Sequence, residues 1–183
     1  MLKRWINDPV LRGIVEWAIA IAVALFAILL LENFVIKSAR IHGPSMESTL
    51  YHGDRVFVNR LAFVFNPPSL GDIVAFPSPT NPDENFIKRV SGLPGDVIDI
   101  VAGYIYRNGY RLEYNHLQGQ GHTFSGTTHF PFIVSENSVF VLGDNLAISQ
   151  DSRFVEVGNV HQDDIIGRVG FRWLPLPRFG RVN

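Results

Sequence analysis

The chain has 183 residues, of which 46% are hydrophobic and 18% charged, and it contains no cysteine. The lack of cysteine excludes disulfides, thiolate metal sites and a cysteine nucleophile. The formal net charge of −1 argues against a large nucleic-acid interface, which is normally basic. Once an N-terminal membrane segment is set aside, about 140–150 residues remain, which suits one domain.

A long apolar segment lies near the N-terminus. Residues 14–31 read IVEWAIAIAVALFAILLL, with Glu16 as their only charged residue. Because about 20 apolar residues can span a bilayer as a helix, we predict a transmembrane anchor at 14–36. Three basic residues precede this segment and two follow it closely. This small excess favours an N-terminus inside the cell, with residues 1–13 in the cytoplasm.

Two other interpretations of the apolar segment fit the sequence less well. A cleaved signal peptide has an apolar region of about 7–15 residues followed by a small-x-small site. This region is longer, and no Ala-x-Ala follows it. A buried core helix is the second alternative, but a helix that is apolar on every face is hard to bury in so small a domain.

After the anchor, the pattern is one of short apolar runs separated by turn residues. Asn108-Gly109 is the strongest signal, because Asn-Gly supplies the positive φ angles of a type I′ hairpin turn. With almost no helical period, the fold class is mainly β: an antiparallel β-rich domain at 37–183, following a single N-terminal transmembrane helix. The expected strands are 34–41, 55–59, 73–76, 86–91, 97–101, 104–107, 110–112, 139–142 and 165–171.

Two stretches suggest a nucleophile and a base. Ser45 lies in GPSMESTL (43–50) among small, turn-forming residues, which leave its hydroxyl open to approach. Lys88 lies within an apolar strand, where full burial lowers the pKa of a lysine from about 10.4 by up to 3–5 units. A neutral amine can take a proton from a serine hydroxyl. The simpler alternatives are a solvated turn serine and an edge-strand lysine that reaches water.

A dense polar loop, GDNLAISQDSR (143–153), directly follows an apolar strand. Asp151 and Arg153 can pair and hold this loop, and the Ser149 hydroxyl can orient a neutral amine. An ordinary turn with a surface ion pair is the alternative interpretation of the loop alone. Taken together, the three stretches predict a serine nucleophile, a lysine base and a buried polar support.

The six histidines raise the alternatives of a Ser-His-Asp triad and a metal site. No Gly-x-Ser-x-Gly occurs, so none of the histidines has a nucleophile elbow as its partner. His116, His122 and His129 lie in a polar excursion at 115–129 and lack the short paired spacing of zinc ligands. The sequence therefore predicts neither a metal nor a cofactor.

In this order, the motifs resemble those of bacterial type I signal peptidases, or leader peptidases, which are Ser-Lys serine proteases. The resemblance implies that Ser45 is the nucleophile, that Lys88 is the general base and that Ser149 orients the lysine. It also implies a supporting loop made of Asp144, Asn145, Asp151 and Arg153. The matching blocks are 43–46 with Thr49-Leu50, 53–56, 71–74, 88–90 with 92–96, and 143–145 with Ser149 and 151–153.

The resemblance further implies removal of N-terminal signal peptides from exported preproteins through an acyl-enzyme. The partners would be signal peptides, the lipid bilayer and the secretion machinery, with no nucleic acid. Since cleavage sites emerge beyond the membrane, it implies a single-pass protein of the cytoplasmic (inner or plasma) membrane, with the catalytic domain extracytoplasmic. Residues 103–136 or so would form a small accessory subdomain.

One departure from the family pattern affects the oxyanion hole. Some members carry a serine two residues before the nucleophile, where this chain has Gly43. The backbone N–H of Ser45 is the expected first donor, and the second donor is left open. Two alternatives also remain: a specialised Ser-Lys processing peptidase with a narrow substrate, and a catalytically silent, membrane-anchored β-domain used for binding.

Overall fold

The computed structural model describes residues 9–30, 35–81, 83–113, 117–120 and 123–182. Some parts of the sequence predictions lie outside these residues. They are positions 1–8 of the predicted N-terminal segment, positions 31–34 of the predicted anchor (34 is also the first position of the strand expected at 34–41), and positions 115–116 and 121–122 of the excursion, which include His116 and His122.

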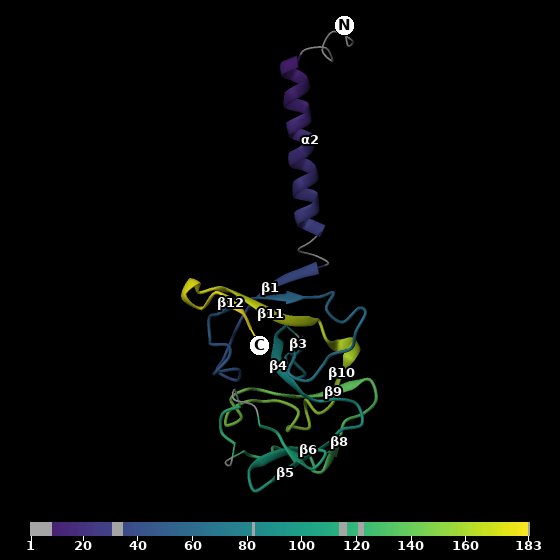
Figure 1. Cartoon of the computed structure of the whole chain (residues 1–183), viewed down its shortest axis with the longest axis vertical. Helices are drawn as coiled ribbons and strands as arrows, with labels where there is room; N and C mark the ends of the chain where they lie inside the picture. The colour runs from purple at the N-terminus through teal and green to yellow at the C-terminus, as the bar shows by residue number, and fades with distance from the viewer. Residues whose placement is uncertain (1–8, 31–34, 82, 114–116, 121–122, 183) are drawn as a thin grey trace.

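The N-terminal helix α2 (Pro9–Leu30) has 22 residues and stands apart from the β-domain (Figure 1). A helix of that length spans about 33 Å, enough for a hydrocarbon core of about 30 Å. The β-domain does not cover the large apolar side chains of this helix: Trp17 is 73% and Phe26 is 63% exposed. By length and composition, the helix is able to cross a membrane.

The β-domain contains two antiparallel sheets, which confirms the predicted fold class of a β-domain after one apolar helix. The larger sheet has the order β1-β2-β11-β3-β4-β9-β10, with β12 paired to β11. Two short 3-10 helices, η2 (Gln162–Asp164) and η3 (Leu176–Arg178), flank β11. The strands of this sheet are β1 (Ile36–Arg40), β2 (Arg55–Asn59), β3 (Ile73–Pro77), β4 (Asn85–Gly92), β9 (Ser138–Leu142), β10 (Val160–His161), β11 (Gly167–Leu174) and β12 (Gly180–Arg181).

The smaller sheet has the order β7-β6-β5-β8 and lies at the end of the domain far from α2 (Figure 1). Asn108 and Gly109 have φ angles of 53° and 80°, which confirms the predicted hairpin turn between β6 and β7. The accessory subdomain was expected at about 103–136, and this sheet also includes β5, which begins at Val97. Its strands are β5 (Val97–Val101), β6 (Tyr104–Arg107), β7 (Tyr110–Arg111) and β8 (Phe132–Ile133).

The segment that carries Ser45 is anchored in the core by its own apolar side chains. Met46 is 2% and Leu50 is 0% exposed, and both belong to a cluster with residues of β2, β3 and β11. Fully burying such a side chain contributes about 1.5–3 kcal/mol. A second cluster packs β3 against β9, and a third joins β5 and β6 to β9. In strand β4, Ile87 packs against the first cluster and Val90 belongs to the second, so β4 lies between two packed clusters.

Gly167 marks a close approach between β11 and the end of β2. A Cβ at this position would lie 2.4 Å from the Asn59 carbonyl oxygen and 3.0 Å from the Arg60 Cα. Because both atoms belong to the backbone, no rotamer change can make room. We expect Gly167→Ala to destabilise the domain by about 1–3 kcal/mol, which is roughly 2–12 °C in Tm for a chain of this size.

The matched control is Gly170→Ala on the same strand, where a Cβ would meet no atom within 4 Å. Thermal unfolding of the detergent-solubilised chain should separate the two variants. Equal Tm values for Gly167→Ala and Gly170→Ala would contradict the steric explanation.

Candidate active site

Residues 43–50, here called the nucleophile turn, form a compact turn after β1. The backbone N–H groups of Thr49 and Leu50 both donate to the Met46 carbonyl oxygen. The turn begins at Gly43, whose φ of 76° suits glycine because it has no Cβ. These local bonds and the buried Met46 present Ser45 at the surface of the turn, where its side chain is partly exposed.

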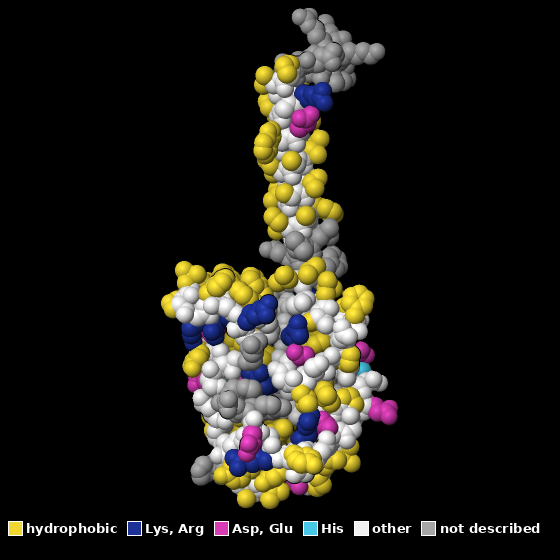
Figure 2. All heavy atoms as spheres, viewed as in Figure 1, with side chains coloured by type: hydrophobic (Ala, Val, Ile, Leu, Met, Phe, Trp, Pro, Cys, Tyr) yellow, Lys and Arg dark blue, Asp and Glu magenta, His cyan; other side chains and the backbone are white. Residues whose placement is uncertain are grey.

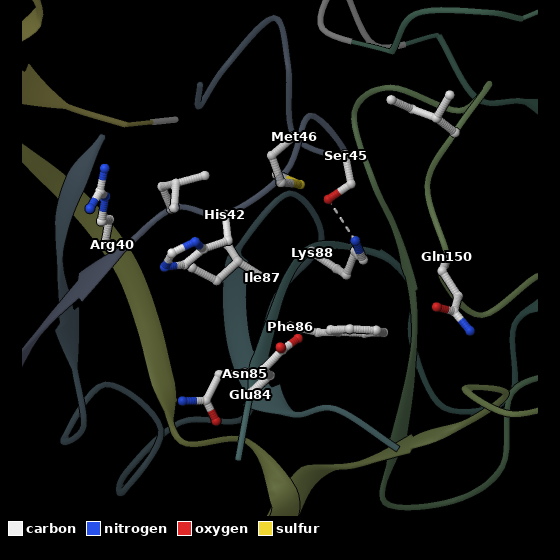
Figure 3. Close-up of a pocket in the computed structure, with 12 residues that line it drawn as sticks. Arg40, His42, Ser45, Met46, Glu84, Asn85, Phe86, Ile87, Lys88 and Gln150 are labelled. Atoms are coloured by element: carbon white, nitrogen blue, oxygen red, sulfur yellow. Dashed lines mark hydrogen bonds between the residues drawn. The ribbon is translucent and has the colours of Figure 1, made fainter. Parts of the chain in front are cut away.

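Ser45 meets Lys88, which comes from the middle of β4. The Lys88 Nζ donates a hydrogen bond to Ser45 Oγ at 2.8 Å, as Figure 3 shows. Lys88 is only 4% exposed, and its Nζ lies 5.1 Å from the centre of the Phe86 ring. The two residues that the sequence predicts as nucleophile and base are thus brought into direct contact across 43 positions of chain.

Burial perturbs the charge state of this lysine. Desolvation is the main cause, and it lowers the pKa of Lys88 from 10.5 to about 8, while the charges of Asp151 and Asp144 oppose the shift and that of Arg153 adds to it. Since an ammonium group has no free electron pair, only the neutral amine can accept the proton of Ser45. A pKa near 8 makes that neutral form common at mildly alkaline pH.

The neighbouring residue Arg89 points to the other side of β4 and supports the nucleophile turn. Its Nε and Nη2 each donate to Asp144 at 2.8 Å, and the two side chains are 1% and 0% exposed. Thr49 Oγ1 donates to the same carboxylate and accepts from Arg89. This bidentate pair joins β4, the polar loop and the nucleophile turn. The sequence predicted Asp144 as support, but it gave no role to Arg89 or Thr49, which it placed only within the matching motif blocks.

A second buried ion pair holds the polar loop. Arg153 Nε and Nη2 donate to the two carboxylate oxygens of Asp151 at 2.7 and 2.9 Å. Asp151 also accepts from the Gly143 N–H at 3.0 Å, and Arg153 Nη2 donates to the Ser149 carbonyl oxygen at 3.1 Å. The pairing expected from the sequence is therefore present, and it is buried rather than superficial.

The polar loop also contacts the backbone of the nucleophile. The Asn145 N–H donates to the Ser45 carbonyl oxygen at 3.0 Å. A Cβ at position 143 would lie 2.5 Å from that carbonyl oxygen and 2.2 Å from Ser149 Oγ. Glycine is therefore required there. Ser149 is 2% exposed, and its Oγ has no hydrogen-bond partner in the described part of the chain. Its predicted role of orienting Lys88 stays a prediction.

A pocket of about 220 Å³ opens beside the Ser45–Lys88 pair. Along one wall, residues 85–88 of β4 pair with β3, while β9 pairs with β4 only from Arg89 onward. Within the described sheet, the second edge of 85–88 is thus unpaired and able to accept an extended peptide. The pocket is lined by Arg40, Ile41, His42, Ser45, Met46, Glu84, Asn85, Phe86, Ile87, Lys88, Ile148 and Gln150.

Histidine chemistry finds less support in the structure. His42 lines the pocket, but the Ser45 hydroxyl is bonded to Lys88. His52 accepts the Gly43 N–H through Nδ1 at 3.2 Å. Among the described residues, no group of three or more His, Asp or Glu side chains could hold a metal ion.

Comparison with known proteins agrees with this geometry. Residues 14–174 match the family described as signal peptidase, peptidase S26. Signal peptidase IB of Staphylococcus aureus (strain COL) is 33% identical over 182 residues, covering 92% of this chain and 93% of the relative. Signal peptidase I of Leptolyngbya laminosa is 36% identical over 185 residues, covering 97% and 86%.

A crystal structure of signal peptidase I from Enterococcus faecalis V583 is 32% identical, with a TM-score of 0.44, covering 55% of this chain and 95% of that one. The family match and the two relatives each extend over most of the sequence. They confirm the resemblance seen in the motifs, and the chain belongs to the signal peptidase family, peptidase S26.

Proposed function

We propose that Ser45 and Lys88 carry out the reaction of this family in the present chain, the hydrolytic removal of N-terminal signal peptides from exported preproteins. One observation carries the assignment. The Lys88 Nζ, buried and with a lowered pKa, lies 2.8 Å from Ser45 Oγ. A base within hydrogen-bonding reach of a nucleophile is the arrangement that covalent catalysis requires.

In the proposed acylation step, neutral Lys88 takes the Ser45 proton while Oγ attacks the scissile carbonyl carbon. The tetrahedral intermediate collapses, and Lys88 gives its proton to the departing amine of the mature protein. The signal peptide remains as an ester on Ser45. Lys88 then takes a proton from water, the resulting hydroxide attacks the ester, and Ser45 is released with its proton restored.

The oxyanion of each intermediate needs fixed donors. We propose the backbone N–H of Ser45 as the first. Gly43 has no side-chain donor, and its N–H already donates to His52 Nδ1 at 3.2 Å. Gly43 therefore does not provide the second donor in this arrangement.

Ser149, Asp144, Asn145, Asp151 and Arg153 are proposed as supporting residues. The two arginine–carboxylate pairs fix the loop, and Asn145 fixes the Ser45 carbonyl group through its N–H at 3.0 Å. Ser149 places a buried hydroxyl beside the same backbone. We propose that this hydroxyl holds the amine of Lys88 in the direction of Ser45.

We further propose that the β-domain lies outside the cytoplasmic membrane, with the N-terminus inside and the secretion machinery delivering preproteins. Figure 2 shows hydrophobic side chains gathered at the end of the domain nearest α2. Among the exposed apolar residues, Ile36 is 40%, Phe57 36%, Leu176 73% and Phe179 60% exposed. These exposed apolar side chains would rest against lipid and bring the pocket close to a membrane-borne substrate.

Substitution of either member of the pair should abolish cleavage. For the detergent-solubilised full chain acting on a model preprotein, we expect Ser45→Ala and Lys88→Ala to lower kcat by more than about 10³-fold. Lys37→Ala is the matched control, since Lys37 is an exposed lysine on β1, and it should cleave as wild type does. Continued cleavage by Lys88→Ala would refute the assignment of the base. The range of preproteins that wild type cleaves would separate general secretion from a narrow substrate.

The rate should follow the deprotonation of Lys88. Because its pKa is lowered to about 8, kcat/KM should rise with pH and level off above a midpoint near that value. A lysine with an ordinary pKa would place the midpoint more than two units higher. A profile that is flat between about pH 6 and 10 would show that no group of this kind controls the reaction.

The same burial should cost stability. Since the pKa of Lys88 falls from 10.5 to about 8 on folding, the folded state binds the proton more weakly than the unfolded state does. Below the folded pKa this penalty is complete, about 3 kcal/mol, and it disappears as the pH rises to the unfolded value. Lys88→Met should therefore be inactive yet more stable near neutral pH, with the gain in Tm shrinking towards about pH 10.

Ser45→Ala is the control for this measurement, because it removes the hydrogen bond while leaving the buried amine. It should show no such pH-dependent gain. A Lys88→Met variant with the Tm of wild type at all pH values would mean that the burial of the lysine carries no cost.

A further inference from the structure

The nucleophile turn has a second anchor, which comes from the C-terminal end of the chain. Arg172 of β11 donates through Nη1 to the Thr49 carbonyl oxygen at 3.0 Å. The same nitrogen lies 3.3 Å from Asp54 Oδ2. Arg172 Nε donates to the Arg178 carbonyl oxygen. One guanidinium group thus links the nucleophile turn, the start of β2 and the helix η3.

Asp54 is the centre of this second anchor. Its side chain is 0% exposed and accepts from Arg178 Nη2 at 2.7 Å and from the Tyr51 N–H at 3.1 Å. The Arg178 guanidinium also lies over the Tyr51 ring, 4.6 Å from its centre. We call Arg172, Arg178 and Asp54 together the C-terminal clamp.

Two arginines from different strands therefore donate hydrogen bonds to the same residue, Thr49. Arg89 of β4 binds the Thr49 hydroxyl at 3.2 Å, and Arg172 binds the Thr49 carbonyl oxygen at 3.0 Å. Thr49 is tied back to Met46, the residue after Ser45, by its own N–H. Met46 is buried, at 2% exposure. A shift of Thr49 would therefore be passed to the backbone that carries Ser45.

The clamp is separated from the chemistry. No hydrogen bond or ion pair of Arg172 or Arg178 in the described residues involves Ser45 or Lys88. Strand β11 runs beside β2 at the end of the domain near α2 (Figure 1), and β12 pairs with β11. Strand β11 pairs with β2 and, through Phe171 and Arg172, with β12. The segment 172–181 thus folds back on itself, with Gly180 opposite Arg172, and Arg172 contacts the nucleophile turn.

We propose that Arg172 is a positioning residue for Ser45, and that the C-terminal segment 172–181 sets the geometry of the nucleophile turn. This inference rests on the proposed role of Ser45 as the nucleophile. A misplacement of about 1 Å can cost roughly 10²-fold in rate. Loss of the Arg172–Thr49 bond leaves the Thr49 hydroxyl, bound to Arg89 and Asp144, as the described contact of Thr49 beyond its own turn. Asp54 keeps Arg178 as its remaining cation.

The pKa of Lys88 distinguishes a displaced nucleophile turn from a general loosening of the site. The pKa of Lys88 is lowered mainly by burial, so a loosened site that admits water would move the pKa back towards 10.5. A shift of the turn alone leaves Lys88 buried on β4. Its signature is a lower plateau of the rate, with the midpoint of the pH profile still near 8.

The test compares variants of the full chain in detergent with a model preprotein as substrate. We expect Arg172→Met to lower kcat by about 10–100-fold, with KM within about 2-fold of wild type and an unchanged midpoint. The kcat of Arg172→Lys should lie between those of wild type and Arg172→Met. An ammonium group can bind Thr49 or Asp54, but it lacks the planar fork that reaches both. The control is Arg168→Met on the same strand, which removes an ion pair to Asp72 at 3.4 Å and should cleave as wild type does.

A wild-type kcat for Arg172→Met, or a reduced kcat accompanied by a raised midpoint, would overturn the inference. If Arg172→Met fails to fold, Arg172→Lys decides by the same criteria. Ser45→Ala separates this inference from the proposed function. An active Ser45→Ala would overturn the function itself, whereas an inactive Ser45→Ala beside a fully active Arg172→Met would overturn only the positioning role.

Discussion

The site depends on the burial of one lysine, Lys88, away from water and beside a serine, Ser45. Burial lowers the pKa of Lys88 to about 8, although two carboxylates nearby act to raise it. Each of these carboxylates is bound bidentately by its own arginine, Asp144 by Arg89 and Asp151 by Arg153. Because both acids already have a cation, neither needs Lys88 as a counter-ion, and the desolvation of the amine decides its charge state.

Strand geometry allows two adjacent cations to play opposite roles. Side chains alternate along β4, so Lys88 faces Ser45 while Arg89 faces Asp144. A guanidinium group keeps its charge even when buried, whereas an amine can lose its proton. The same strand therefore supplies a permanent charge that holds the structure together and a removable proton for chemistry. An exchange of the two residue types would disturb both functions.

Around this pair, the nucleophile turn is held from several directions. Asn145 binds the Ser45 carbonyl oxygen, Thr49 lies between Arg89 and Arg172, and Met46 and Leu50 are buried beneath. The polar loop can approach so closely only because position 143 is glycine. The constraints come from β4, β11, the polar loop and the core cluster with residues of β2 and β3, so a single hydroxyl is located by several strands of the larger sheet.

The sequence by itself determined the antiparallel β-domain behind an apolar helix, because strand alternation, Asn-Gly turns and apolar length are local properties. It also indicated Ser45, Lys88 and the Asp151–Arg153 pair, whose motifs are short and contiguous. The tertiary structure decided whether Lys88 is buried, because an apolar strand pattern does not show what covers the strand. In the described sheet, residues 85–88 of β4 are not paired with β9, and only the fold brings the Ser45 turn over the Lys88 amine, beside the Phe86 ring. Only the fold revealed Arg89 with Asp144, 55 positions away, and Asp54 with Arg172, 118 positions away. Such contacts depend on strand order and register, which place β11 between β2 and β3, and no local pattern specifies them.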